Sequence, residues 1–185
     1  MPILPREPEL FPDDLFSEQV DLPTDAPWWA IYTLSRREKD LMRRLRAMEV
    51  PFYCPIITRK TKSPSGRVRK SHVPLFSGYV FAQGSTEQRL QILQTNCVSR
   101  TLEVEDGAGL LRDLSQIHQL IQSEVPMTVE SKIQPGQAVR VISGSFAGLE
   151  GVVLQRRGVE HLIVSVQFLQ QGAAVAIEDF QVEPI

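Results

Sequence analysis

Pro74-Leu75-Phe76-Ser77-Gly78-Tyr79-Val80-Phe81 is the stretch of sequence that decides the fold. Its aromatic residues do not alternate cleanly with polar residues, as they would in a strand that buries only one face. Tyr79 and Phe81 have the same strand parity, so one face of a sheet carries both rings. Either these rings are core residues, or the opposite face packs the helices and the rings form an exposed apolar patch of the kind that marks a partner site.

A second informative stretch, residues 135–153, has the pattern of two short strands joined by a turn rich in glycine. These glycines suit tight turns and a bulge, so they indicate a fold more than a function. β-Branched residues then alternate as far as Phe168 at the short spacing of a small barrel. Phe146 at a turn tip, and Phe168 and Leu169 beside another turn, are harder to explain as core residues.

The chain of 185 residues is long enough for one medium domain or two small ones. Its 42% of hydrophobic and 23% of charged residues are typical of globular proteins. Its apolar runs are far shorter than the ~18 residues of a spanning helix, and its first residues lack the pattern of a secretory signal peptide. We therefore expect a cytoplasmic protein without membrane contact.

Patterns of catalytic or metal-binding residues find little support in the sequence. His72, His118 and His161 have no serine, cysteine or paired carboxylates beside them, and no phosphate-cradling glycine loop occurs. Cys54 and Cys97 are too few for a disulfide framework and are expected to be small core residues. We predict that the protein is not an enzyme and holds neither a metal ion nor a cofactor.

The net charge of −2 hides a strong asymmetry along the chain. Residues 1–27 contain seven acidic residues, one arginine and six prolines, and they are predicted to form a disordered or loosely docked tail. Residues 36–70 contain twelve basic residues against three acidic ones. The sequence therefore predicts a basic face suited to nucleic acid, and one hypothesis is that the acidic tail covers this face.

The order of the expected elements indicates an α+β fold. A buried strand over residues 28–34 precedes a helix for which Ser35 and Glu38 form a capping box. Residues 56–62 and 67–73 flank a turn and predict a protruding basic hairpin. The segments that follow are the quoted strand, a helix capped by Ser85 and Gln88, a strand over 98–104 and a helix over 110–122. This order suits an antiparallel or mixed sheet with flanking helices.

The two informative stretches resemble the NusG family of transcription elongation factors, whose N-terminal domain carries a PLFPGYVF-like strand and whose C-terminal domain carries a KOW motif. The opening run Trp28-Trp29-Ala30-Ile31-Tyr32 also matches. The resemblance implies a ferredoxin-like α+β sandwich followed by a small β-barrel KOW domain. Its expected boundaries are an acidic tail over 1–27, the N-terminal domain over 28–123, a linker over 124–134 and the KOW domain over 135–185.

The resemblance also implies sites and partners. The family's N-terminal domain binds the clamp helices of RNA polymerase through an apolar pocket, which here would be lined by Tyr32, Phe76, Tyr79 and Phe81. Ser85 and Thr86 match positions that contact the opposite pincer of the polymerase. Upstream or non-template DNA would lie against Arg36, Arg37, Arg43, Arg59, Lys60, Lys62, Arg67, Arg69 and Lys70. The KOW domain recruits a small-subunit ribosomal protein or Rho, and the matching positions are Phe146, Phe168 and Leu169.

The chain departs from the housekeeping pattern at Ser77, where proline is usual, and at Leu169-Gln170-Gln171, where the family has Phe-Gly-Arg. These departures concern the coupling to Rho or the ribosome. The short basic hairpin and the acidic extension are more similar to specialised, operon-specific paralogs of the RfaH, UpxY and LoaP kind. The resemblance implies a non-enzymatic elongation or antitermination factor that suppresses pausing or termination. The alternative is a KOW-containing protein that binds RNA or associates with the ribosome.

Overall fold

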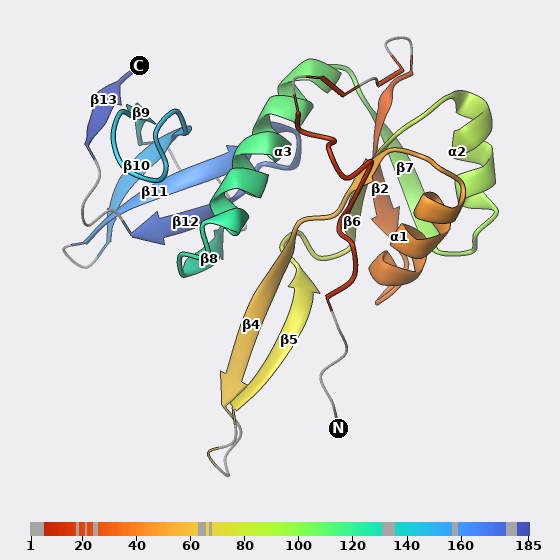
Figure 1. The fold of residues 1–185 in the computed structure, drawn as a ribbon, viewed down its shortest axis with the longest axis horizontal. Helices are drawn as coiled ribbons and strands as arrows, with labels where there is room; N and C mark the ends of the chain where they lie inside the picture. Colours follow the sequence, from red (N-terminus) through yellow and green to blue (C-terminus); the bar gives the residue numbers. More distant parts are fainter. Residues whose placement is uncertain are drawn as a thin grey trace. The chain divides into compact units, whose positions relative to one another are not determined.

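The computed structural model describes residues 6–17, 19–20, 22–23, 26–62, 66, 68–130, 136–156, 159–176 and 181–185. The chain divides into two compact units, Met1–Gly107 and Ala108–Ile185. Among the described residues, no helix is long and apolar enough to cross a membrane. Figure 1 shows the arrangement of helices and strands within each unit.

The first unit is built on a five-stranded antiparallel sheet in the order β1-β3-β6-β2-β7. Its strands are β1 (Leu10–Phe11), β2 (Trp28–Thr33), β3 (Phe52–Tyr53), β6 (Tyr79–Gln83) and β7 (Val98–Val104). The quoted stretch thus supplies β6, which lies between β3 and β2 in the middle of the sheet. The expected α+β class with an antiparallel sheet and helices is confirmed.

Helices α1 (Glu38–Ala47) and α2 (Thr86–Leu93) pack on one face of this sheet. Leu41 and Leu45 of α1 and Ile92 of α2 form one buried cluster with Trp29 and Ile31 of β2. The period of the apolar residues in α1 therefore predicted the buried side of the helix correctly.

The two predicted capping boxes have different outcomes. Ser85 accepts a hydrogen bond from the backbone N–H of Gln88, and the Gln88 side chain accepts one from the backbone of Ser85, which confirms the box at α2. The box at α1 is wrong, because the helix begins after Arg37 without a side-chain cap. Glu38 turns away from the helix start, and its carboxylate accepts a hydrogen bond of 2.9 Å from the backbone N–H of Gly78.

The predicted basic hairpin is formed by β4 (Ile56–Lys62) and β5 (Val68–Pro74), which pair only with each other and project from the five-stranded sheet (Figure 1). Ile56 is buried at the base of the hairpin, whereas every described residue from Thr58 to Ser71 is exposed. The hairpin therefore presents its charged side chains to solvent on both faces.

Residues 6–17, named here the N-terminal strap, are docked on the first unit, whereas the sequence predicts a disordered or loosely docked tail over residues 1–27. β1 of the strap pairs with the edge strand β3, Leu15 is buried, and the Phe16 ring packs against the edge of Tyr53 at 4.9 Å. Ordering this segment costs chain entropy, which a purely acidic segment could not offset. Here the cost is offset by a short strand and by three apolar side chains, Phe11, Leu15 and Phe16. Residues 1–5, 18, 21, 24 and 25 lie outside the described part of the chain.

The second unit contains α3 (Gly107–Gln122) and a six-stranded antiparallel sheet in the order β13-β9-β10-β11-β12-β8. The strands are β8 (Met127–Glu130), β9 (Gln137–Val141), β10 (Glu150–Arg156), β11 (Val159–Val166), β12 (Gln171–Ala176) and β13 (Val182–Pro184). A short 3-10 helix over Gln167–Leu169 joins β11 to β12. The pairing order is that of an open ladder in the described residues, so barrel closure stays a prediction.

Helix α3 contacts this second sheet directly. The backbone N–H of Glu150 donates to Gln116 at 2.7 Å, and the backbone N–H of Gln167 donates to Asp113 at 2.8 Å. The sequence predicts this helix as part of the first domain, with a boundary at residue 123, whereas the contacts group residues from Ala108 with the C-terminal strands. The domain boundaries given above stay a prediction.

Candidate partner-binding surfaces

Tyr32 and Tyr79 form the accessible part of the predicted aromatic pocket. The two residues lie opposite each other on β2 and β6, and their ring centroids are 5.2 Å apart in an edge-to-face arrangement. The Tyr32 side chain is 37% exposed, and Tyr79 is half-buried. We call these two residues the tyrosine pair.

Two neighbours fix the tyrosine pair. Arg100 lies opposite Tyr32 on β7, and its guanidinium is 5.2 Å from the centre of the Tyr32 ring, a cation–π contact. Gly78 has a φ of 82° and lies so close that a β-carbon there would be 3.0 Å from Cε2 of Tyr32. Arg100 is not among the predicted site residues, although the alternation of residues 98–104 puts it on one sheet face with Leu102.

Phe76 and Phe81 are buried, with 1% and 0% of their surfaces exposed. Their rings meet edge to face at 6.4 Å. Phe81 lies between Tyr53 of β3 and Ala30 of β2, and both of these neighbours are themselves buried. The structure therefore separates the four predicted pocket residues into an accessible tyrosine pair and two buried rings.

Ser85 and Thr86 are both exposed, at the start of α2. The Ser85 hydroxyl accepts the capping hydrogen bond of 3.2 Å from Gln88. Its remaining hydrogen-bonding capacity, and that of Thr86, face solvent. These two residues are thus available for a contact, as the resemblance implies.

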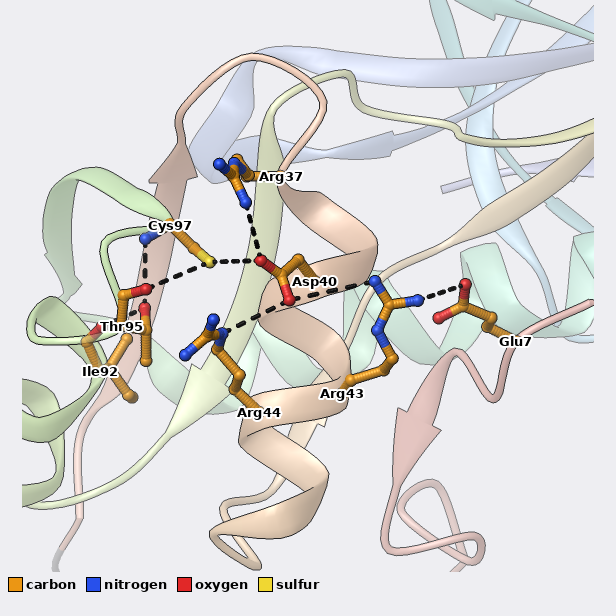
Figure 2. A network of polar contacts seen from close by, with 8 residues as sticks. All are labelled: Glu7, Arg37, Asp40, Arg43, Arg44, Ile92, Thr95 and Cys97. Atoms are coloured by element: carbon orange, nitrogen blue, oxygen red, sulfur yellow. Dashed lines mark hydrogen bonds and ion pairs between the residues drawn. The ribbon is translucent and has the colours of Figure 1, made fainter.

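The basic residues of α1 form a network around Asp40 (Figure 2). Arg37 and Arg44 contact this carboxylate at 3.0 and 3.4 Å, and Arg43 does so at 3.9 Å. The Cys97 thiol donates to it at 3.4 Å. This hydrogen bond is the largest cause of the lowered pKa of Asp40, and the arginines add to it. The carboxylate is therefore held ionised beside three cations.

The α1 arginines are exposed to different degrees. Arg36 precedes the helix with a φ of 61° and is exposed. Arg37 and Arg43 have side chains that are 54% and 62% exposed despite their ion pairs. All three predicted residues of this region therefore reach solvent, which is what contact with a phosphate backbone requires.

The hairpin sorts its basic residues onto two faces. Lys60 lies directly opposite Lys70, and Lys62 shares their face, while Arg59 and Arg69 point to the other face. Directly opposed like charges destabilise a strand pair, so this face favours an anionic partner. None of these five side chains has an ion-pair partner within the described part of the chain. Arg67, also predicted, lies outside the described residues.

The three predicted partner-binding residues of the C-terminal unit also separate. Phe146 is fully buried, because the turn between β9 and β10 folds back through hydrogen bonds from Gly148 to Val141 and from Leu149 to Phe146. Phe168 is 38% exposed and Leu169 is half-buried, both in the 3-10 helix. Only the latter two are accessible to a partner.

The described residues contain no group of three or more histidine, cysteine, aspartate or glutamate side chains that could hold a metal ion. Cys54 and Cys97 are buried free thiols, in agreement with their expected place in the core.

Comparison with known families adds the decisive observation. Residues 26–133 match the family model described as "Transcription termination factor nusG". The chain belongs to the NusG family. The matched range starts just before β2 and includes the tyrosine pair, the α1 network and the basic hairpin. A search of curated proteins found no match.

Membership of the NusG family assigns the chain to a family of transcription factors that are generally not enzymes and whose general partner is RNA polymerase. Residues 135–185 lie outside the matched range. The KOW identity of the second unit, and the assignment to the specialised paralogs, are therefore not part of this finding.

Proposed function

We propose that this NusG-family chain is an elongation or antitermination factor that docks on the clamp helices of RNA polymerase through the tyrosine pair. Tyrosine and arginine are the residues that most often dominate protein interfaces, and Arg100 stacks on Tyr32 at the centre of this surface. The half-exposed, mutually packed rings of Tyr32 and Tyr79 are the observation that carries the proposal.

The basic hairpin and the start of α1 orient upstream or non-template DNA in this proposal. Contacts with phosphates position a protein on a duplex but carry no sequence information. Exposed lysines and arginines without competing ion pairs are suited to that task, and the described part of the hairpin offers five of them. By holding polymerase and DNA together, the factor suppresses pausing or termination.

In this proposal the second unit recruits a further partner through Phe168 and Leu169, the accessible residues of the 3-10 helix. A small-subunit ribosomal protein or Rho is the partner class that the family resemblance implies. Phe146 serves the core of the unit instead.

The test is co-purification of RNA polymerase with the tagged protein, after nuclease treatment and in salt high enough to screen nucleic-acid contacts. Wild type is expected to recover polymerase, and the Tyr32→Ala, Tyr79→Ala double variant is expected to lose it. Leu90→Ala is the control, because Leu90 is 51% exposed on α2 and outside the tyrosine pair. Equal recovery with the double variant would refute the site. Ribosomes or RNA recovered without polymerase would favour the alternative of an RNA-binding protein.

A further inference from the structure

The N-terminal strap lies against the basic side of α1 and places acidic side chains on two of its arginines. Glu7 contacts Arg43 at 3.0 Å, and Asp13 contacts Arg46 at 2.9 Å. Arg46 also donates to the backbone carbonyl of Leu10 at 3.3 Å, and its guanidinium lies 5.6 Å from the centre of the Phe11 ring. Strap and helix therefore meet through complementary charge as well as through apolar contact.

The strap is anchored independently of these ion pairs. β1 pairs with β3, and the backbone N–H of Cys54 donates to the carbonyl of Glu9 at 2.8 Å. Leu15 is 1% exposed, and Phe16 packs on Tyr53. Backbone hydrogen bonds and apolar burial are little affected by salt or by a polyanion, so the anchor holds when the carboxylates move.

Each of the two ion pairs, in contrast, has one largely exposed partner, while the Glu7 and Arg46 side chains are 26% and 37% exposed. The Arg43 side chain is 62% exposed and the Asp13 side chain is 81% exposed. Surface ion pairs of this kind contribute little because water and salt screen them. When a cation binds a nucleic-acid backbone, condensed counterions are released and this release favours binding. An isolated carboxylate has no condensed counterions to release. Phosphates can therefore displace Glu7 and Asp13 while the strap stays docked.

The acidic side chains of the strap contact only some of the α1 arginines. Arg37 and Arg44 are held by Asp40 of the same helix, and Figure 2 shows Glu7 reaching the network only through Arg43. Arg36 has no ion pair within the described residues. The strap thus occupies only the side of α1 that carries Arg43 and Arg46.

We propose that the N-terminal strap is an intramolecular competitor of DNA, in which the Glu7 and Asp13 carboxylates occupy the positions that backbone phosphates take on Arg43 and Arg46. This inference rests on the proposed function, because it requires that α1 contacts DNA. The consequence is a factor with low affinity for free duplex, whose full basic surface becomes available only where DNA is held beside it at high local concentration.

The test is the Glu7→Gln, Asp13→Asn double variant, which keeps the shape of both side chains and removes their charge. The control is Asp14→Asn, Glu105→Gln, which removes the same charge from two exposed residues without an ion pair in the described structure. Affinity for a mixed-sequence DNA duplex is measured by fluorescence anisotropy between about 50 and 200 mM salt, the range over which phosphate contacts dominate. Tryptophan fluorescence checks that both variants stay folded.

The strap variant is expected to bind duplex about 3- to 10-fold more tightly than wild type at about 50 mM salt. The reason is that each surface ion pair, which DNA must break in wild type, lowers the affinity by a factor of a few. Its plot of log affinity against log salt should be steeper by about 0.9 for each arginine that gains a phosphate. The control should stay within about 2-fold of wild type. In an Arg43→Ala, Arg46→Ala background, the strap substitutions should have no further effect.

Equal affinities of wild type, strap variant and control would overturn the competitor and leave the proposed function standing. An equal gain in both variants would also overturn it, because net charge would then explain the gain. If none of the proteins bound duplex at any salt, the competitor and the DNA contact of the proposed function would both fail, while polymerase recovery would test the tyrosine pair separately.

Discussion

Replacing Leu15 by alanine tests whether the N-terminal strap is part of the folded first unit. Leu15 is 1% exposed and lies next to Phe16, whose ring packs on Tyr53 of the edge strand. A disordered tail would tolerate this change without cost. A docked strap loses the transfer free energy of the buried side chain and gains a cavity.

The expected loss of folding free energy in Leu15→Ala has a lower and an upper bound. Leucine-to-alanine changes in cores cost about 2 to 5 kcal/mol. The strap pairs through a strand of two residues, so it can detach locally, and the cost cannot exceed the free energy of its docking. We therefore expect Leu15→Ala to lower the free energy of unfolding by about 2 kcal/mol, at the lower end of the range for core leucines.

Urea unfolding followed by tryptophan fluorescence is the suitable assay. Trp28 and Trp29 are the only tryptophans of the chain, and both lie on β2, so the signal reports on the first unit. Leu90→Ala is the matched control: Leu90 is 51% exposed on a helix, and its loss should change stability by less than about 0.5 kcal/mol. A Leu15→Ala protein as stable as the control would refute the docked strap.

Three further predictions concern the tyrosine pair, a buried carboxyl and the thiols. Gly78→Ala should cost about 1 to 2 kcal/mol and lower polymerase recovery, because the new β-carbon meets the Tyr32 ring; Gly66→Ala, with a φ of 80° but open space, should keep full recovery. Burial raises the pKa of Glu9 above its ordinary value of 4.5, so its contribution to folding is full at low pH and is lost as the pH rises through the raised pKa. Urea midpoints of Glu9→Gln should therefore fall less than those of wild type from about pH 4.5 to neutrality, and parallel curves would contradict this. Burial also raises the pKa of both cysteine thiols, so Ellman's reagent should react with them only after denaturation, and rapid reaction of the native protein would show that a thiolate is accessible.

The sequence predicted those elements whose signals are local. The period of α1, the capping box at Ser85 and the hairpin of β4 and β5 are all set by residues within about one element of each other. The capping box at Ser35 failed because a distant group, the backbone N–H of Gly78, competes for the carboxylate of Glu38. Local pattern cannot reveal such a competitor.

The same limit applies to the candidate site. Strand parity correctly put Tyr79 and Phe81 on one face, but it could not tell that one ring is exposed and the other buried. That difference depends on the neighbours of each ring: Phe81 packs on the buried Phe76, whereas Tyr79 packs on the exposed Tyr32. Likewise, composition described residues 6–17 as a tail, although their docking depends on the free edge of β3, more than thirty residues away in sequence.

The pairing of charges changes what the basic segment can contribute to DNA binding. Twelve basic residues over 36–70 suggest a uniform cationic surface. In the structure, Arg37 and Arg44 are bound to Asp40, Arg43 and Arg46 are occupied by the strap, and the hairpin carries its cations without ion pairs in the described residues. A lysine or arginine releases a full counterion from DNA when it contacts a phosphate without first giving up an ion pair of its own. The salt dependence of DNA binding by wild type should therefore be dominated by the hairpin. Lys60→Gln, Lys70→Gln should therefore reduce that dependence more than Arg43→Ala, Arg46→Ala does, and the two reductions should become similar once Glu7 and Asp13 are neutralised.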